Sequence, residues 1–325
     1  MSDAIIQIRN LSVDFPSEAG RVQAVRGLNL DVRAGEVLGL VGESGSGKSV
    51  TSLSMIGLLP PTARVSGEIL YEGKNLLELS DDEMSKYRGS DIAMVFQDPM
   101  TALTPVYTIG WHIREQLQLH GNISNQAAKQ RAIELLEEVG IPDPAKRVDQ
   151  YPHEFSGGMR QRAIIAMALS LNPKLLIADE PTTALDVTIQ AQILDLLERL
   201  RKTHNSSIII ITHDMGVVSE LSSEVLVMYA GRMVERSTKS ALFANPQHPY
   251  TKGLMNSVPR VDRARTSRLE TISGQPASLL NLPSGCAFRT RCSSAHAACT
   301  EQPVFTADSN GYGAACFLLT EGVRS

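Results

Sequence analysis

The sequence lacks a long apolar segment. Its longest apolar stretches, Ala163 to Leu171 and Ser207 to Ile211, are far shorter than the roughly 20 residues of a membrane-spanning helix. The N-terminal residues do not combine a basic region with an apolar run, so no secretion signal is predicted. We therefore expect a cytoplasmic protein that reaches a membrane only by docking on a partner.

An excess of basic residues is also lacking. The 31 Lys and Arg residues are outnumbered by 35 Asp and Glu residues, and the formal net charge is −4. Nucleic-acid-binding domains usually carry a basic patch or stripe, so no nucleic-acid partner is predicted. With 325 residues, of which 42% are hydrophobic, the chain can form one large domain and a smaller one.

Cysteine is absent from the first 285 residues, and the tail holds four in the spacing C-x5-C-x6-C-x16-C, at Cys286, Cys292, Cys299 and Cys316. Disulfides are one interpretation, which a cytoplasmic setting disfavours. Four thiolates in a loop-rich segment also suit a zinc ion or an iron–sulfur cluster, although the spacing is not the C-x2-C of most zinc ribbons. Four unconnected thiols are a further alternative.

The strongest motif fits the phosphate-binding pattern G-x-x-x-x-G-K-[ST]. A buried strand is predicted before it, at Glu36 to Val41, and a helix after it, from Ser49 to Leu59, stopping at Pro60. The glycines let backbone N–H groups approach phosphates. Lys48 would reach the β- and γ-phosphates, and Ser49 would bind Mg²⁺. The predicted nucleoside-triphosphate loop is Gly42, Glu43, Ser44, Gly45, Ser46, Gly47, Lys48 and Ser49.

Strands and helices alternate along most of the chain. Strands are predicted at 5–15, 25–32, 67–71, 91–96, 175–178, 208–211 and 225–229. Helices are predicted at 126–139, 159–171 and 188–203. The spacing of βαβ units predicts an α/β fold with a parallel sheet, interrupted by a helical insert at about 100–168.

The character of the sequence changes after about residue 243. A breaker-rich hinge at 245–250, a short helix at 251–257 and a polar, basic linker from Arg260 to Arg268 follow one another. From Ser273 onward, Gly, Pro, Ser and Cys dominate. We predict a main domain at 1–244 and a small, irregular, cysteine-rich domain at 245–325.

Two further stretches carry candidate chemistry. The strand from Leu175 ends in Asp179, placed to hold Mg²⁺, and Glu180, placed as the base that orients an attacking water. Two acids at a strand end can instead be a solvated terminus. Ser156-Gly157-Gly158 opens an apolar helix, where a serine cap and two glycines let a ligand touch the backbone. A plain helix cap is the alternative interpretation.

The order of these motifs resembles the ATP-binding cassette family across roughly 5–243. Residues 42–49 are similar to its Walker A loop, 175–179 to its Walker B strand, and Ser156, Gly157, Gly158 and Met159 to its signature turn. The turn departs from the commoner L-S-G-G-Q at Phe155 and Met159, but the serine and glycines are intact. The resemblance implies a P-loop NTPase fold, with a RecA-like parallel-sheet core and antiparallel β and helical subdomains.

The resemblance also assigns roles to single residues. Gln97 is similar to the Q-loop glutamine, Asp186 to the D-loop aspartate and His213 to the switch histidine. It implies catalysis by Glu180, His213 and Gln97, and Mg²⁺ bound through Ser49, Gln97 and Asp179. Phe15 is in the place of the aromatic that stacks on adenine; a strand core residue is its alternative. Two cassettes would form a head-to-tail dimer, with each ATP between one phosphate loop and the partner's signature turn.

The C-terminal residues 245–325, called the tail, point to one branch of this family. The motifs N-P-x-H-P-Y-T at 245–251 and G-C-x-F-x-x-R-C at 285–292 are similar to the C-terminal extension of peptide-importer cassettes. The whole chain resembles the D-type subunit of dipeptide and oligopeptide permeases. That resemblance implies a 4Fe–4S cluster on the four cysteines. Thr290 replaces the proline that this group often has before Arg-Cys, and every candidate ligand is retained.

The resemblance also implies a set of partners and a place of action. They are a homologous second ATPase subunit, two integral-membrane permease subunits docked on the helical insert near Gln97, and, indirectly, an extracytoplasmic peptide-binding protein. The chain would lie at the cytoplasmic face of the bacterial inner membrane. The alternatives are a cassette for nickel chelates, glutathione or murein peptides, a soluble repair or translation cassette, and a regulator whose tail senses iron or redox state.

Overall fold

The computed structural model describes residues 4–18, 20–98, 102–183, 185–257 and 272–321. The chain divides into two compact units. Unit 1 comprises Met1–Ile5, Val32–Glu36 and Glu78–Ile210, and unit 2 comprises Ile6–Asp31, Val37–Leu77 and Ile211–Ser325. The predicted linker at 260–268 lies outside the described residues, as does Ala184, the first residue of the predicted D-loop at 184–186. Among the described residues, no helix is long and apolar enough to cross a bilayer.

Unit 1 contains a β-sheet whose strands lie in the order β8-β7-β6. Strands β6 and β7 run parallel, with Ile92 beside Leu175 and Val95 beside Ala178. All five residues of β7 are buried, which explains its unbroken apolar sequence before the acidic end. The strands are β6 (Ile92–Val95), β7 (Leu175–Asp179) and β8 (Ser207–Thr212).

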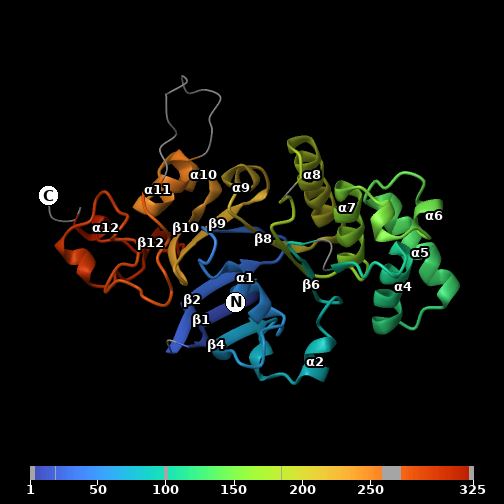
Figure 1. The fold of residues 1–325 in the computed structure, drawn as a ribbon, viewed down its shortest axis with the longest axis horizontal. Coiled ribbons are helices and arrows are strands. Elements are labelled where there is room, and N and C mark those ends of the chain that lie inside the picture. Colours follow the sequence, from blue (N-terminus) through green and yellow to red (C-terminus); the bar gives the residue numbers. More distant parts are fainter. Residues whose placement is uncertain (1–3, 19, 99–101, 184, 258–271, 322–325) are drawn as a thin grey trace. The chain divides into compact units, whose positions relative to one another are not determined.

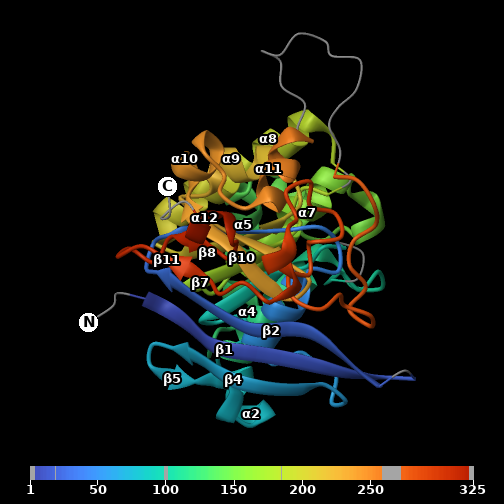
Figure 2. The same ribbon diagram turned by 90° about the vertical axis from the view of Figure 1, so that its left-hand side faces the viewer.

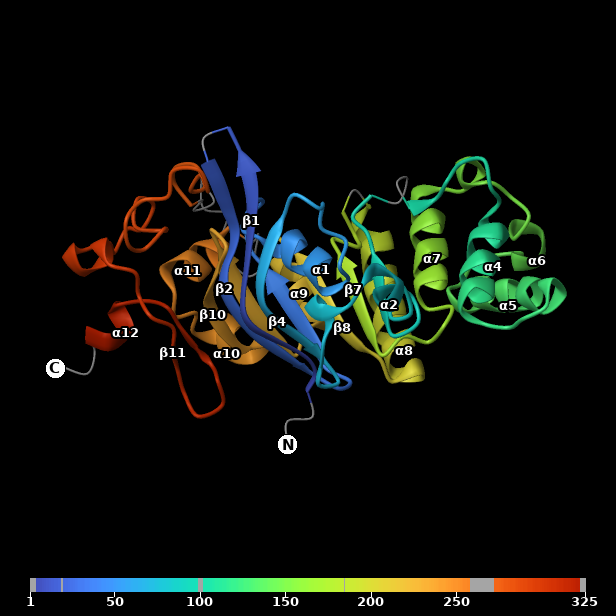
Figure 3. The same cartoon turned by 90° about the horizontal axis from the view of Figure 1, so that it is seen from below.

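Helices α4 to α7 of unit 1 occupy the segment where the helical insert is predicted (Figures 1 and 3). Thr108 and Ser124 cap α4 and α5, because each side chain accepts a hydrogen bond from a backbone N–H of the first turn. Helix α5 packs against both α4 and α7. Among the described residues, the α-helices of this unit are α2 (Asp81–Ser85), α4 (Ile109–His120), α5 (Asn125–Glu138), α6 (Pro144–Arg147), α7 (Gly157–Ala168) and α8 (Val187–His204).

An antiparallel sheet in the order β2-β1-β4-β5 forms one layer of unit 2, and Figure 2 shows its strands side by side. β1 pairs with β4 through partners such as Ile8 and Ile69, both fully buried. The alternating sequence places such residues on one buried face. The strands are β1 (Ala4–Ser17), β2 (Gly20–Arg33), β4 (Arg64–Tyr71) and β5 (Lys74–Asn75).

A mixed sheet in the order β11-β12-β10-β9-β3 is the second layer of strands in unit 2. β3 and β9 are parallel, whereas β10 is antiparallel to both β9 and β12. The strands are β3 (Val37–Val41), β9 (Glu224–Tyr229), β10 (Arg232–Thr238), β11 (Thr306–Ala307) and β12 (Gly313–Ala314). The helices are α1 (Lys48–Met55), α9 (Met215–Leu221), α10 (Lys239–Ala244), α11 (Pro249–Asn256) and α12 (Leu318–Glu321).

The C-terminal segment shares a hydrophobic core with the rest of unit 2. Val227 and Tyr229 of β9 belong to the same buried cluster as Tyr250, Ala287 and Phe288. Strands β11 and β12 extend the mixed sheet beyond β10. The described residues of the tail therefore contribute to the core of unit 2. The separate domain expected at 245–325 stays a prediction.

The structure corrects the predicted end of the helix after the phosphate loop. Helix α1 ends at Met55 rather than near Leu59. Gly57 has a φ of 63°, and Leu58 N donates to Leu53 O at 2.9 Å, while Gly57 N donates to Ser54 O at 3.2 Å. These two hydrogen bonds form a glycine-dependent helix stop, so the helix ends before Pro60 is reached. The parallel sheet of the sequence interpretation likewise becomes mixed where the hairpin of β9 and β10 adds an antiparallel strand.

Candidate functional site

The phosphate loop lies between the buried strand β3 and the first turn of α1 in unit 2. Gly47 caps α1 in a left-handed conformation, with a φ of 105°. A Cβ at Gly47 would lie 2.6 Å from the Ala24 carbonyl oxygen, so the position requires glycine. Lys48 is 6% exposed, and its Nζ donates to the carbonyls of Gly42 at 2.7 Å and Glu43 at 3.0 Å. The ammonium therefore lies inside the curve of the loop.

Phe15 and Ser49 are accessible in the same unit. Phe15 lies in β1, is half-buried and does not belong to the buried hydrophobic core. This position favours an accessible aromatic side chain over a core residue. Ser49, in the first turn of α1, is exposed. His213 follows the last residue of β8 and is also exposed.

The predicted base and the predicted Q-loop glutamine are joined in unit 1. Gln97 Nε2 donates to Glu180 Oε2 at 3.3 Å, and Thr183 Oγ1 donates to the same oxygen at 2.7 Å. Glu180 has a φ of 47°, an uncommon left-handed conformation for a residue that is not glycine. Asp179, the last residue of β7, is 5% exposed. The two acids therefore differ: Asp179 is buried at the end of β7, and Glu180 is half-buried.

The predicted signature turn caps a helix in unit 1. Ser156 Oγ accepts a hydrogen bond from Met159 N at 3.3 Å at the start of α7, which confirms the predicted N-cap. Gly157 is exposed and Gly158 is half-buried. Asp186 caps α8 in the same way, because its Oδ1 accepts from Ile189 N at 2.9 Å. Both motifs thus present the N-terminus of a helix, where anions are favoured.

The predicted site residues therefore fall into two groups. Unit 2 contains the phosphate loop at 42–49, Phe15 and His213. Unit 1 contains Gln97, Asp179, Glu180, Asp186 and the signature turn at 156–159.

The four cysteines line one small cavity in unit 2, together with His248, Phe288 and His296. They form no disulfide. Burial raises the pKa of three of the thiols, Cys286, Cys292 and Cys316, so these thiols are favoured in the protonated form at neutral pH. As placed, the described residues contain no group of three or more His, Cys, Asp or Glu side chains that could hold a metal ion. The structure thus brings the thiols together without arranging them as a ligand set.

Sequence reasoning missed two contacts of the tail. Arg291 forms an ion pair with Glu43 of the phosphate loop, with a closest distance of 2.6 Å. Glu235, 1% exposed, accepts hydrogen bonds from Gln247 N and His248 N, each at 2.8 Å. The signals in the sequence were the two tail motifs, of which the first contains His248 and the second contains Arg291.

Comparison with known proteins covers both parts of the chain. The family described as "ABC transporter" matches residues 25–183, and that described as "Oligopeptide/dipeptide transporter, C-terminal region" matches residues 234–299. A probable peptide ABC transporter ATP-binding protein of Sinorhizobium fredii is 52% identical over 99% of this chain and 97% of its own. The oligopeptide transport ATP-binding protein OppD of Bacillus subtilis is 53% identical over 95% of this chain and 87% of its own.

Solved structures show the same fold. The ATP-binding cassette MJ0796, as a dimer bound to ADP and phosphate, has a TM-score of 0.65 and 28% identity, over 72% of this chain and 98% of its own. CbiO1 of Clostridium perfringens, part of an ABC transporter complex, has a TM-score of 0.64 and 30% identity, over 75% of this chain and 92% of its own. With relatives more than half identical across nearly its whole length, the chain belongs to the ABC transporter family of ATP-hydrolysing, ATP-binding subunits.

Proposed function

We propose that this chain is the ATPase subunit that energises import of dipeptides or oligopeptides through an ABC transporter. The observation that carries the proposal is the extent of the similarity: the peptide-transport relatives match the tail as well as the cassette. A dipeptide transport ATP-binding protein of Bacillus subtilis is 50% identical over 97% of this chain.

The proposed reaction uses the site residues predicted from the sequence. ATP would be held by the phosphate loop, with Phe15 against adenine and Lys48 on the β- and γ-phosphates. Mg²⁺ would be bound through Ser49, Gln97 and Asp179. Glu180 would orient the attacking water, and its hydrogen bonds from Gln97 and Thr183 hold the carboxylate in one orientation. His213 would contact the γ-phosphate.

The proposed assembly is a head-to-tail pair with a homologous second cassette. A phosphate of the ATP held by the partner cassette would contact the signature turn at 156–159. The glycines of this turn leave the start of α7 accessible. Two integral-membrane subunits would dock on the helical insert at the cytoplasmic face of the bacterial inner membrane. An extracytoplasmic peptide-binding protein would deliver the cargo. Binding and hydrolysis of ATP would then close and open the pair.

Uptake by a strain that lacks this chain tests the proposal. We expect the wild-type chain to restore uptake of labelled dipeptides or oligopeptides, and a Glu180→Gln chain to fail. Labelled glutathione and nickel are the controls for cargo. Restored uptake of one of these, without peptide uptake, would overturn the peptide assignment, and no restored uptake of any cargo would favour a cassette outside transport.

We also propose that the four cysteines hold a 4Fe–4S cluster. Two observations support this: all four line one cavity, and none is used in a disulfide. Four cysteine thiolates are the usual ligands of such a cluster, and binding would require the thiols to lose their protons and come closer than they lie here. Protein purified without oxygen should contain about four iron and four sulfide per chain, and a Cys286→Ser chain should contain less. Zinc, or no metal in either chain, would overturn this proposal and leave the ATPase unaffected.

A further inference from the structure

An arginine of the tail is bound to the phosphate loop. Arg291 donates through Nη1 and Nη2 to the two carboxylate oxygens of Glu43, at 2.6 and 3.0 Å. Glu43 is the second residue of the loop and Arg291 lies 248 positions later, but both belong to unit 2. The Arg291 side chain is 4% exposed and that of Glu43 is 25% exposed. A two-pronged, largely buried pair of this kind fixes the orientation of both groups.

Other contacts hold the guanidinium itself in place. Arg291 Nε donates to the Ser273 carbonyl at 3.0 Å, and Nη1 lies 3.4 Å from the Tyr229 hydroxyl. Its Cζ lies about 6 Å from the ring centroids of both Tyr229 and Phe288. The ion pair is therefore part of a packed network, unlike a mobile surface pair that contributes little.

The tail contacts the loop at one further place and lines a cavity beside it. Glu43 N donates to the Tyr250 hydroxyl at 2.7 Å, so a backbone N–H of the phosphate loop is bound by α11. A cavity of about 340 Å³ lies between loop residues 43–46, Val22 and tail residues 276–280. The C-terminal segment thus forms one wall of the space beside the loop.

The charge of Glu43 gives the ion pair a direct consequence for the nucleotide. Glu43 places a negatively charged carboxylate in the loop that accepts the triphosphate of ATP. The carboxylate and the triphosphate are both negative, so they repel each other. Arg291 places a positive charge 2.6 Å from that carboxylate and so offsets its negative charge. We propose that Arg291 is a positioning residue of the nucleotide site, which holds Glu43 so that the phosphate loop keeps the shape and charge that accept ATP. The C-terminal segment then contributes to ATP binding at that site, whatever cargo the transporter carries.

The test is the dissociation constant for Mg-ATP of the full chain, measured with a fluorescent ATP analogue and by calorimetry. Arg291→Gln should weaken binding about tenfold, because an unpaired carboxylate then lies beside the phosphates. Arg291→Lys should give an intermediate loss, because it keeps the charge and loses the second hydrogen bond. Adding Glu43→Gln to Arg291→Gln should recover most of the affinity, since the repelling charge is gone.

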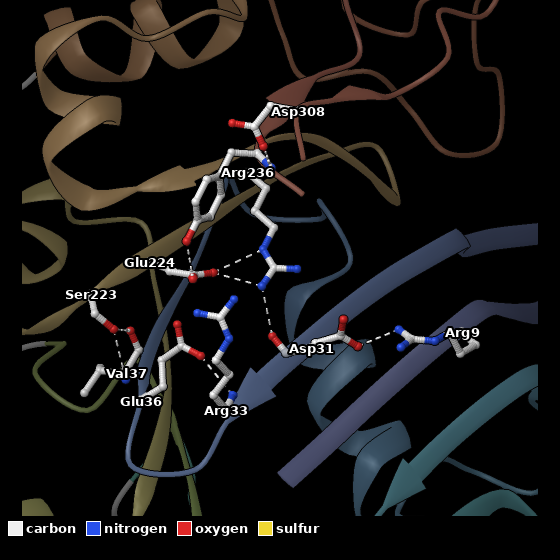
Figure 4. A network of polar contacts seen from close by, with 10 residues as sticks. Arg9, Asp31, Arg33, Glu36, Val37, Ser223, Glu224, Arg236 and Asp308 are labelled. Carbon is white, nitrogen blue, oxygen red and sulfur yellow. Dashed lines mark hydrogen bonds and ion pairs between the residues drawn. The ribbon is translucent and has the colours of Figure 1, made fainter. Parts of the chain in front are cut away.

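A matched control is available in the same unit. Arg236 forms an ion pair with Glu224 at 2.8 Å and donates to the Asp31 carbonyl, and its side chain is also largely buried (Figure 4). It does not contact the phosphate loop, so Arg236→Gln should lower the melting temperature without changing the affinity for ATP. Equal effects of Arg291→Gln and Arg236→Gln on affinity would overturn the proposal. So would a double variant that binds ATP as weakly as Arg291→Gln alone, because the role would then be structural rather than electrostatic.

Discussion

Gln97 and Glu180 are joined by a hydrogen bond of 3.3 Å, although 83 residues separate them in the chain. Thr183 donates to the same carboxylate oxygen at 2.7 Å, from the turn that follows β7. Two donors on one oxygen hold the Glu180 side chain in one orientation. This geometry suits a carboxylate that must present its remaining lone pairs to a water molecule.

Replacing Glu180 by glutamine should separate ATP binding from ATP turnover. The amide keeps the size of the side chain but cannot accept a proton from the attacking water. Loss of a general base costs roughly 10²- to 10⁴-fold in rate, so we expect hydrolysis to fall by at least about 100-fold while ATP affinity is retained. Phosphate release and nucleotide binding, measured on the same preparation, check this expectation.

The control is Glu198, an acidic residue of unit 1 that is paired with an arginine. Glu198 bonds to Arg201 at 2.8 and 2.9 Å in α8, and these bonds hold the pKa of its carboxyl at about 2. Glu198→Gln should leave turnover unchanged. Rapid hydrolysis by the Glu180→Gln chain would contradict the role proposed for Glu180.

The two glycines of the signature turn should respond differently to alanine. A Cβ at Gly158 would lie 2.9 Å from Ile189 Cγ2 of α8, whereas a Cβ at Gly157 would meet nothing closer than Leu185 Cδ2 at 4.0 Å. Gly158→Ala should therefore destabilise unit 1 by about 1–3 kcal/mol through overpacking. Gly157→Ala should leave the free energy of unfolding within about 1 kcal/mol of the wild type.

Gly157→Ala tests the proposed contact with the partner's ATP. Its new methyl group would lie at the exposed start of α7, where the partner's phosphate is proposed to bind. We expect weaker ATP-dependent association with the partner cassette and an unchanged melting temperature of the Gly157→Ala chain. Light scattering of the pair with the Glu180→Gln background measures this association, and full association of the Gly157→Ala chain would exclude a close contact at this glycine.

Local sequence determined most of the elements and the separate motifs. The buried strand β7 and the caps at Ser156 and Asp186 follow from neighbouring residues, because apolar runs and N-cap side chains act over a few positions. The structure joins Gln97 and Glu180 by a hydrogen bond, and their proposed roles came from resemblance rather than from periodicity. Neither residue carries a local signal for the other.

The arrangement of the tail could not be derived from its sequence. Burial of Phe288 against Tyr229 and Tyr250 depends on tertiary packing between segments far apart in the chain. The pairing of Arg291 with Glu43 has the same origin, since a single charge has no periodicity. The composition of the tail, rich in Gly, Pro and Ser, is typical of loops, and it gives no signal for the core that the described tail residues share with β9.

The stability of unit 2 should depend on pH through His248. Burial lowers the pKa of this side chain to about 4 from an ordinary 6.5, and its Nδ1 accepts a hydrogen bond from Tyr250 N at 3.1 Å. The unfolded chain therefore binds a proton between pH 6.5 and 4 that the folded chain does not. The contribution of His248 to the free energy of unfolding is fully present above pH 6.5 and falls by about 3 kcal/mol as the pH drops to 4.

His248→Asn should remove that dependence while keeping an acceptor for the Tyr250 N–H. The neighbouring Glu235, whose pKa is raised by burial, acts in the opposite direction, because its folded form gains stability when it takes up a proton. It is present in both chains, so the difference between wild type and variant isolates His248. Denaturant unfolding at pH 7 and pH 4.5 measures it; equal pH slopes in the two chains would contradict the assignment.

Gly285 should be essential for the arrangement of the cysteines. Its φ is 73°, and a Cβ there would lie 2.3 Å from the Thr300 carbonyl carbon and 2.6 Å from the Cys299 carbonyl oxygen, which accepts a hydrogen bond from Cys286 N. Alanine at this position forces the Cys286 and Cys299 segments apart. We expect a loss of at least about 2 kcal/mol in stability, and faster alkylation of the four thiols as they become exposed.

Gly311 provides a control that separates backbone strain from the clash. It lies in the same tail with a φ of 83°, but a Cβ there would meet nothing within 4 Å. Gly311→Ala should therefore cost only about 1–2 kcal/mol, the ordinary cost of a left-handed alanine, with unchanged thiol reactivity. Alkylation rates of native protein, read by mass spectrometry, compare the two variants. If Gly285→Ala reacts no faster than Gly311→Ala, the close approach at Gly285 does not hold the cysteines together, because strain alone would then account for both variants.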